Sequence, residues 1–498
     1  MSQHKTRFLT LSALAICMAQ PALSLTAEEL WAEWQAQAVA MGQTITAKQV
    51  TAENGVLTLR GYASQFSDDD VSTLGQFDQV VMTETGDGRV VVTLSDTYAI
   101  RMSFATEPGA APIEAVVNVI MPGMTITASG DAGARIFAYD APRITIEDGP
   151  ITGGMGLLSK IDLTIAIEDY AATVQTDGRD LADMRSITTS STSAISGAFS
   201  LTPPPGEDGT LAASFAIESI AATGTGSFGN LAAIAKTPDV LPPGFGFQSD
   251  LRHDNASFEL RFAHPSGGFE FLTASQGGSV QTSLSEAGLS FGSATTGSSS
   301  SFRGPDLPVG VDIAMASAEF GFSVPLAQSD SAQPFGARLA YQDVVLNPEI
   351  WDLFDPAQAI PRNPISVIAD VTGSLRVLVD LLSTAPDQIT GMPGELVDLS
   401  LNELRIAVAG AELTGTGAAV FAPGPSPRPV GSVDLQLAGS NALLDRLKNS
   451  GLLPVEQLAM ARGLLAAFTR PGAGPDTVQT TIAFTEGGGI TANGVPLQ

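Results

Sequence analysis

The sequence predicts a mainly β protein, in which extended antiparallel sheets form a curled groove or a sandwich, with an N-terminal helix and a C-terminal helical hairpin. Three observations support this fold class. Most of the chain consists of short segments in which apolar and polar residues alternate, separated by Gly, Pro and Asp. Helical periodicity is confined to a few segments, mainly near the two ends. The composition is 44% hydrophobic and only 15% charged, which supplies enough apolar material for a sizeable core.

Composition also excludes several classes of function. The chain has 498 residues with 24 Lys and Arg against 52 Asp and Glu, a formal net charge of −28. Nucleic acid is therefore not an expected partner, because phosphate binding depends on Lys and Arg that displace counterions. One Cys and three His exclude most metal centres and disulfide frameworks. We expect neither a metal nor a cofactor.

The N-terminal segment is predicted to be a secretory signal peptide. Two basic residues precede an apolar stretch over residues 8–19, and small residues precede a polar segment. The stretch is shorter than the roughly 20 residues that a transmembrane helix needs. We expect cleavage between Ser24 and Leu25 and a periplasmic location. Cys17 follows Ile16 rather than the small residue typical of lipoprotein signals, and lipidation of Cys17 remains an alternative.

The segment after the predicted cleavage site is expected to begin with a helix and then a hairpin. Thr26 and Glu29 have the spacing of a capping box, and Gly42 ends the apolar periodicity. The period then changes to two. Asn54 and Gly55 separate two alternating segments, which is typical of a tight turn between antiparallel strands.

The clearest single strand is KIDLTIAIEDY. Its alternation places Ile161, Leu163, Ile165 and Ile167 on one side and polar or small residues on the other. The same pattern recurs in SFELRF and SVDLQL. The four aliphatic residues of the first segment are therefore our candidate face for an apolar ligand.

Helices are too few to cover sheets of this extent. They are predicted at residues 230–235, 349–354, 442–449 and 455–468, in addition to the opening helix. The sheets must then cover each other in a sandwich, close into a barrel, or hold an apolar ligand in a groove. An outer-membrane barrel is disfavoured, since such barrels carry aromatic girdles and this chain has 5 Tyr and 3 Trp.

The predicted organisation after the signal peptide (residues 1–24) is two lobes. Residues 25–202 form the opening helix and a β lobe, and residues 210–498 form a second β lobe that ends in the helical hairpin. The boundary falls at a Pro-rich loop beginning at Pro203. Residues 297–301 (GSSSS) are expected to be a flexible stretch or a long hairpin tip, and residues 422–429 a hairpin loop.

Several motifs are better explained by ordinary structure. Residues 224–229 fit a dinucleotide-binding pattern but lack a surrounding βαβ unit, and residues 288–292 fit a nucleophile elbow but lack a following helix. Residues 68–70 are three Asp without the spacing of a calcium loop. His253 and His264 lie at opposite ends of one predicted strand, where turn positions are the expected role.

The C-terminal part resembles a known family. The segments QPFGARLAYQDVVLNPEIWDLFDP, GLLPVEQLAMARGLLAAF and TIAFTEGGGITANGVPLQ resemble the alphaproteobacterial domain-of-unknown-function family 2125, most specifically after Gln333. Asn347 and Pro348 are expected to cap and open the short helix there. That family supplies no catalytic positions. More distantly, the end of the chain is similar to AsmA-type envelope proteins, a resemblance that implies long β-grooves associated with lipid.

We therefore expect a periplasmic, non-enzymatic, β-rich protein that binds a lipid or another apolar envelope component. Two alternatives stay open. A structural or assembly partner in the envelope would use the same strands as a closed sandwich without a ligand. A hydrolase would need His253 or His264 beside a serine and a carboxylate. The oligomeric state and the strand order are not predicted.

Overall fold

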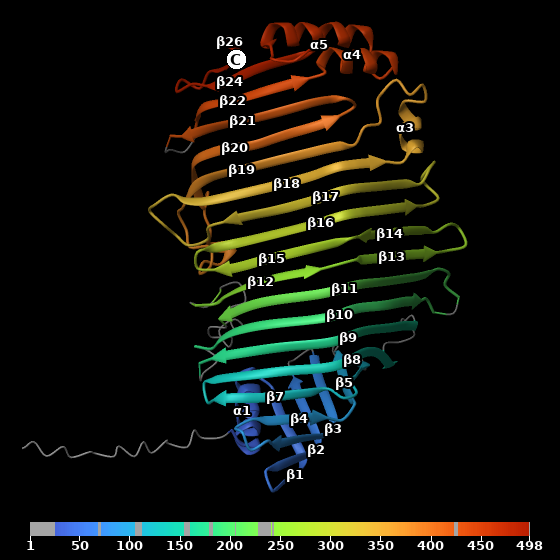
Figure 1. Cartoon of the computed structure of the whole chain (residues 1–498), viewed down its shortest axis with the longest axis vertical. Coiled ribbons are helices and arrows are strands. Elements are labelled where there is room, and N and C mark those ends of the chain that lie inside the picture. The colour runs from blue at the N-terminus through green and yellow to red at the C-terminus, as the bar shows by residue number, and fades with distance from the viewer. Residues whose placement is uncertain are drawn as a thin grey trace, which may run out of the picture.

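The computed structural model describes residues 25–67, 71–104, 112–153, 160–178, 183–204, 206–227, 241, 244–422 and 427–497. In this part of the chain, 26 strands form one antiparallel sheet, and most of these strands follow one another along the long axis of the molecule (Figure 1). The predicted signal segment up to Ser24, the acidic turn 68–70 and the predicted helix 230–235 lie outside the described residues.

The N-terminal half consists of α1 (Ala27–Ala40), β1 (Thr44–Glu53), β2 (Val56–Ser67), β3 (Val71–Glu84), β4 (Val90–Leu94), β5 (Thr97–Phe104), β6 (Ile113–Ile120), β7 (Thr125–Asp131), β8 (Ala134–Thr152), β9 (Lys160–Asp177), β10 (Arg185–Thr202) and β11 (Thr210–Ser227). The middle consists of β12 (Gly246–His253), β13 (Ala256–Ala263), β14 (Phe269–Ser275), β15 (Gly277–Ser285), β16 (Gly288–Arg303), β17 (Val311–Val324) and β18 (Gln333–Leu346). The C-terminal part consists of α3 (Pro348–Phe354), β19 (Ile365–Val377), the 3₁₀ turn η1 (Pro386–Gln388), β20 (Gly394–Val408), β21 (Ala411–Phe421), β22 (Pro429–Ala438), α4 (Ser440–Asn449), α5 (Val455–Phe468), β23 (Arg470–Pro471), β24 (Thr477–Phe484), β25 (Ile490–Ala492) and β26 (Val495–Pro496).

The strand order follows the chain order closely. In two places in the middle of the sheet, a pair of short strands shares the space that one long strand occupies elsewhere. Strands β12 and β13 both pair with β11, and β14 and β15 both pair with β16. From β16 to β22 each strand pairs with the next one. The predicted boundary between the two lobes coincides with the β10–β11 turn, and these two strands pair along their length.

The opening helix packs on the N-terminal end of the sheet. The capping box at Thr26 and Glu29 is confirmed, with reciprocal bonds of 3.2 and 3.0 Å. Leu30 and Trp31 lie in a buried cluster with strand residues that include Leu59 and Phe137. The first strands run at a steep angle to the later ones (Figure 1). This end of the sheet therefore has a conventional core between helix and strands.

A buried ion pair joins α1 to β8. Arg135 is 7% exposed and contacts Glu33 of the helix at 2.6 Å. We expect Glu33→Ala to lower the free energy of unfolding by about 3 kcal/mol, because it leaves Arg135 buried without its counter-charge. Urea unfolding of this variant beside Glu28→Ala, an exposed position on the same helix, measures the effect. Equal losses in the two variants would contradict the assignment.

The C-terminal helices are confirmed close to their predicted bounds, with one correction. Asn347 occupies the N-cap position and Pro348 begins α3, as predicted, but the Asn347 side chain makes no capping bond; it accepts from Asp312 N–H and donates to the Gly310 carbonyl, both at 3.0 Å. The same side chain also donates to Glu349 Oε2 in the first turn of α3, at 3.0 Å, so its donor and acceptor together link the neighbouring loop to the start of the helix. Trp351 of α3 packs in a small cluster with Ile360 and Ala409, against Leu443 of α4.

The prediction for residues 297–301 was wrong. These residues are not a loop but the middle of β16, where they pair with β17 and, in part, with β14. Serine can occupy a strand that is partly exposed to solvent. A serine-rich composition therefore does not distinguish such a strand from a loop. The predicted hairpin around residues 422–429 is confirmed, since Phe421 pairs with Pro429.

Mainly β architecture with extended antiparallel pairing is confirmed. Of the forms that the sequence left open, the described strands belong to one continuous sheet, rather than to two sheets packed face to face. Within the residues that the structure describes, no second sheet covers either surface of this sheet, so the two surfaces can be compared directly.

Candidate apolar binding face

The predicted ligand face on β9 continues onto the neighbouring strands. Residues that pair directly across an antiparallel sheet project from the same side. On β10 the partners of Ile161, Leu163 and Ile167 are Leu201, Phe199 and Ile195. On β11, β13 and β14 the same side carries Leu211, Phe215, Ile217, Phe258, Leu260, Phe262, Phe269 and Phe271.

An irregular line crosses the strands near their middle. Asp169, Ser219, Gly297 and Asp343 have positive φ values of 50°, 49°, 56° and 53° within their strands. At this line the alternation of side chains shifts by one residue: in β11 the less exposed positions are odd up to Ile217 and even from Ile220 onward. Such irregularities bend strands and change the direction of side chains. We call this the crease line.

The shift keeps one side of the sheet free of charged side chains on both halves of each strand, and most of its large side chains are apolar. We call this side, from β9 to β24, the apolar face. The crease line divides this face into two arms. Arm A is the part of the face formed by the inward-alternating residues within 160–168, 194–202, 210–218, 256–263, 269–275, 298–303, 311–315 and 344–346. Arm B is formed in the same way within 170–177, 185–192, 220–227, 246–252, 277–285, 288–296, 317–324 and 333–342, together with β19 to β24. Arm B residues on this face include Phe291, Phe322, Leu339, Val371, Leu401, Leu435 and Ile482.

Charge separates the two sides of the sheet. Outside the crease line, no Asp, Glu, Lys or Arg of the described β9–β24 strands projects from the apolar face. The opposite side, the polar face, carries the ion pairs, such as Arg261 with Glu270 at 2.8 Å and Arg303 with Asp312 at 2.8 Å. The sheet is therefore amphipathic over its whole length.

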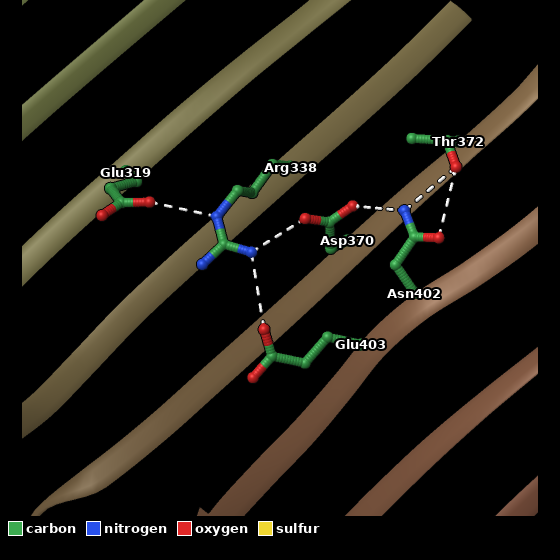
Figure 2. A network of polar contacts seen from close by, with 6 residues as sticks. All are labelled: Glu319, Arg338, Asp370, Thr372, Asn402 and Glu403. Atoms are coloured by element: carbon green, nitrogen blue, oxygen red, sulfur yellow. Dashed lines mark hydrogen bonds and ion pairs between the residues drawn. The ribbon is translucent and has the colours of Figure 1, made fainter.

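The polar face is organised by a network on β17 to β20. Figure 2 shows Arg338 between Glu319, at 3.0 Å, and Asp370, at 2.9 Å, with Glu403 at 3.5 Å. Glu319 and Asp370 raise the pKa of Arg338 further. A bond from Asn402, with help from Arg338, lowers the pKa of Asp370. This network links strands β17 to β20 on the polar face.

Phenylalanines dominate the exposed part of the apolar face. On arm A the ring centroids of Phe258 and Phe271 are 6.3 Å apart, and those of Phe269 and Phe302 also 6.3 Å. On arm B the rings of Phe291, Phe320 and Phe322 lie 6.0 to 6.1 Å from one another. These clusters touch side by side but are not covered. Phe258 is 36% exposed, Phe302 38% and Phe320 47%.

The described helices cover only the ends of the apolar face. Helix α1 lies over the N-terminal end, where Val174 of arm B packs against the core that it forms. Helices α3 and α4 lie near the other end, where they pack on Leu346 and Ile365. A contiguous, partly exposed apolar surface is typical of an interaction site.

The rejected motifs occupy ordinary positions. Residues 224–227 and 288–292 lie in strands β11 and β16. His264 Nδ1 is 2.6 Å from Ser266 Oγ in a turn, and His253 Nδ1 is 2.7 Å from the Asp254 carbonyl. Among the hydrogen bonds of the described residues, neither ring reaches a carboxylate. Within the same part of the chain, no group of three or more His, Cys, Asp or Glu is arranged to hold a metal ion.

The sequence pattern identified the alternation of β9, β13 and β22, but it did not show that these strands share one face or that the phenylalanines of β14, β16 and β17 gather on it. The missing signal was the change of parity within single segments, such as Ile217 followed by Ile220 with Glu218 and Ser219 between them. A search for strict alternation of apolar and polar residues interprets such a segment as two separate strands or as a loop.

Comparison with known proteins gives one match. Residues 312–497 match the family model described as "Uncharacterized protein conserved in bacteria (DUF2125)". The matched residues run from the start of β17 to the C-terminal strands and include α3, α4 and α5. No curated protein and no solved structure matches the chain. None of the helices in the described ranges is both long and apolar enough to cross a membrane.

Proposed function

We propose that the protein binds the acyl chains of lipids, or a similarly elongated apolar molecule, on the apolar face and that it catalyses no reaction. The observation that carries this proposal is the continuous charge-free surface from β9 to β24 with partly exposed phenylalanines. Covering one such side chain contributes about 1.5–3 kcal/mol. A ligand that covers several of them gains enough to offset the cost of association.

The dimensions favour an elongated ligand or several of them. Twelve strand-to-strand pairings separate β9 from β24. At about 4.8 Å for each step, the face is about 58 Å long. Within either arm, an acyl chain can lie along the strands or across them without meeting a charged side chain.

The expected compartment agrees with this proposal. A signal peptide would deliver the chain to the periplasm, where envelope lipids are present. The resemblance of the C-terminal end to AsmA-type envelope proteins supports the same class of ligand by analogy of fold only. The net charge of −28 disfavours adhesion to anionic membranes, so affinity for lipid must come from apolar contact.

Mass spectrometry tests the proposal. The full chain is purified from the cell envelope and weighed under native and denaturing conditions, and organic extracts are analysed for lipid. We expect native masses that exceed the denatured mass by one or more lipids, with the same lipids in the extract. A native mass equal to the denatured mass in repeated preparations would contradict lipid binding and favour the alternative, an envelope partner protein that covers this face. The denatured mass also reports whether the chain begins at Leu25.

A further inference from the structure

We propose that helix α5 docks the protein on the surface of a phospholipid bilayer, with one side of the helix inserted at the level of the headgroups. We call this side the outer side of α5. It consists of exposed apolar or small residues: Val455, Ala459, Met460, Gly463, Leu464, Ala466 and Ala467. The inference goes beyond the proposed function and does not depend on it, because it concerns a helix at one end of the sheet.

The outer side of α5 is apolar where the exposed side of a helix is normally polar. Val455, Met460 and Leu464 are each more than half exposed, and Leu452, just before the helix, is nearly half exposed. The neighbouring helix α4 shows the usual pattern, because each of its exposed residues is polar: Asn441, Asp445, Lys448 and Asn449. A group of exposed, large apolar side chains on one helix indicates a surface for interaction.

The opposite side of α5 holds the helix in place. Leu458 is buried there, and Arg462 makes an ion pair of 2.6 Å with Asp445 of α4. At the end of the helix, the Phe468 carbonyl accepts a hydrogen bond of 2.8 Å from Thr480 Oγ1 of β24. The helix is therefore fixed to its neighbours, with its outer side directed away from them.

Charge favours a membrane as the partner of this surface. Residues 440–471, which include α4 and α5, carry four basic and two acidic side chains, whereas the rest of the chain carries 20 basic and 50 acidic ones. Lys448 and Arg470 are exposed, and none of the ion pairs among the described residues uses either of them. Glu456, the acidic residue of α5, lies in its first turn, at one end of the outer side. Anionic lipids attract the basic side chains and repel the acidic remainder of the chain, so contact with the bilayer is confined to this end.

The position of α5 relates the docked bilayer to the apolar face. Helices α4 and α5 lie at the end of the long axis opposite α1 (Figure 1). With 14 residues, α5 is shorter than the roughly 20 residues that span a bilayer, so it lies along the membrane surface. Thr480, which bonds the end of α5, pairs directly with Leu435, so both side chains project from the apolar face. Docking through α5 therefore brings the β24 end of the apolar face to the bilayer.

Flotation with vesicles of phosphatidylcholine and phosphatidylglycerol, at about 3:1, tests the inference. We expect the full chain to bind these vesicles. The variant Met460→Gln with Leu464→Gln is expected to bind them at least about tenfold more weakly, because it loses apolar area that the bilayer covers. Glutamine is compatible with a helix and leaves the net charge unchanged. The matched control, Val39→Gln with Val50→Gln, removes two exposed apolar side chains near α1 and is expected to bind as the wild type does. Thermal unfolding checks that both variants fold.

A wild-type chain that stays free of the vesicles, or a Met460 and Leu464 variant that binds them as tightly as the wild type, would overturn the docking of α5. If the wild-type chain instead formed dimers that this variant abolished, the outer side would be an interface between two copies and not a membrane contact. Native masses separate these results from the proposed function, because both variants are expected to retain the lipid that copurifies with the wild type. A chain that binds vesicles through α5 but carries no lipid would contradict the proposed function and leave the docking intact.

Discussion

Deletion of Asp343 is expected to lower the free energy of unfolding by about 3–4 kcal/mol, the usual cost of displacing large side chains from their packed environment. Asp343 lies on the crease line of β18 with φ at 53°. Removing it restores strict alternation, so one half of the strand must turn over. If residues 333–342 turn over, Arg338 loses its contacts with Glu319 and Asp370, at 3.0 and 2.9 Å; if residues 344–346 turn over, Leu346 leaves the cluster around Trp351.

Two substitutions separate this effect from the loss of the side chain itself. Asp343→Gly keeps the number of residues and favours a positive φ, and we expect stability within about 1 kcal/mol of the wild type. Asp343→Val also keeps the residue count but places a β-branched residue in the left-handed region, at a cost of about 1–2 kcal/mol. Urea unfolding of the three variants gives the order Gly, Val, deletion. A deletion variant as stable as Asp343→Gly would show that the irregularity at Asp343 does not determine which side chains of β18 project from the apolar face.

The crease line also shows how far the sequence predicts this fold. The alternation of Ile161 to Ile167 predicted the side of β9 correctly, because a period of two is a direct consequence of strand geometry. The capping box at Thr26 and Glu29 and the Asn54–Gly55 turn were equally local signals, and both are present in the structure. Features that depend on residues close together in the sequence, such as a helix cap or a tight turn, could therefore be predicted without knowledge of the fold.

The positions that the sequence did not reveal depend on neighbours distant in the chain. Gly297 and the serines after it look like a loop, and only the pairing with β17 shows them to be a strand with an irregular centre. Asn347 is a residue type that commonly caps helices, but its side chain hydrogen-bonds the Gly310 carbonyl of the neighbouring loop and not the backbone of α3. Arm B alternates out of phase with arm A, so the extent of the apolar face emerges only when the strands are aligned.

The second large effect is expected from a charge placed on the apolar face. Phe322 lies on arm B, with its ring 6.1 Å from that of Phe291 and 6.0 Å from that of Phe320. The substitution Phe322→Asp removes apolar area from the centre of this cluster and adds a carboxylate that a bound acyl chain would have to desolvate. Losing the burial of one phenylalanine alone is worth about 2 kcal/mol, or roughly 30-fold in affinity, and the buried charge adds to this. We therefore expect lipid to be absent from the purified variant.

The adjacent residue provides the control, because neighbouring positions of a strand face opposite sides. Ser323 lies on the polar face and is exposed, so Ser323→Asp adds the same charge to the same strand without touching the phenylalanine cluster. This variant is expected to copurify with as much lipid as the wild type. If Phe322→Asp also retained its lipid while remaining folded, the ligand would have to occupy a different surface. If both variants lost lipid, added negative charge on an already acidic chain would explain the result, and Phe322→Ser, which removes the ring without adding charge, would distinguish contact from net charge.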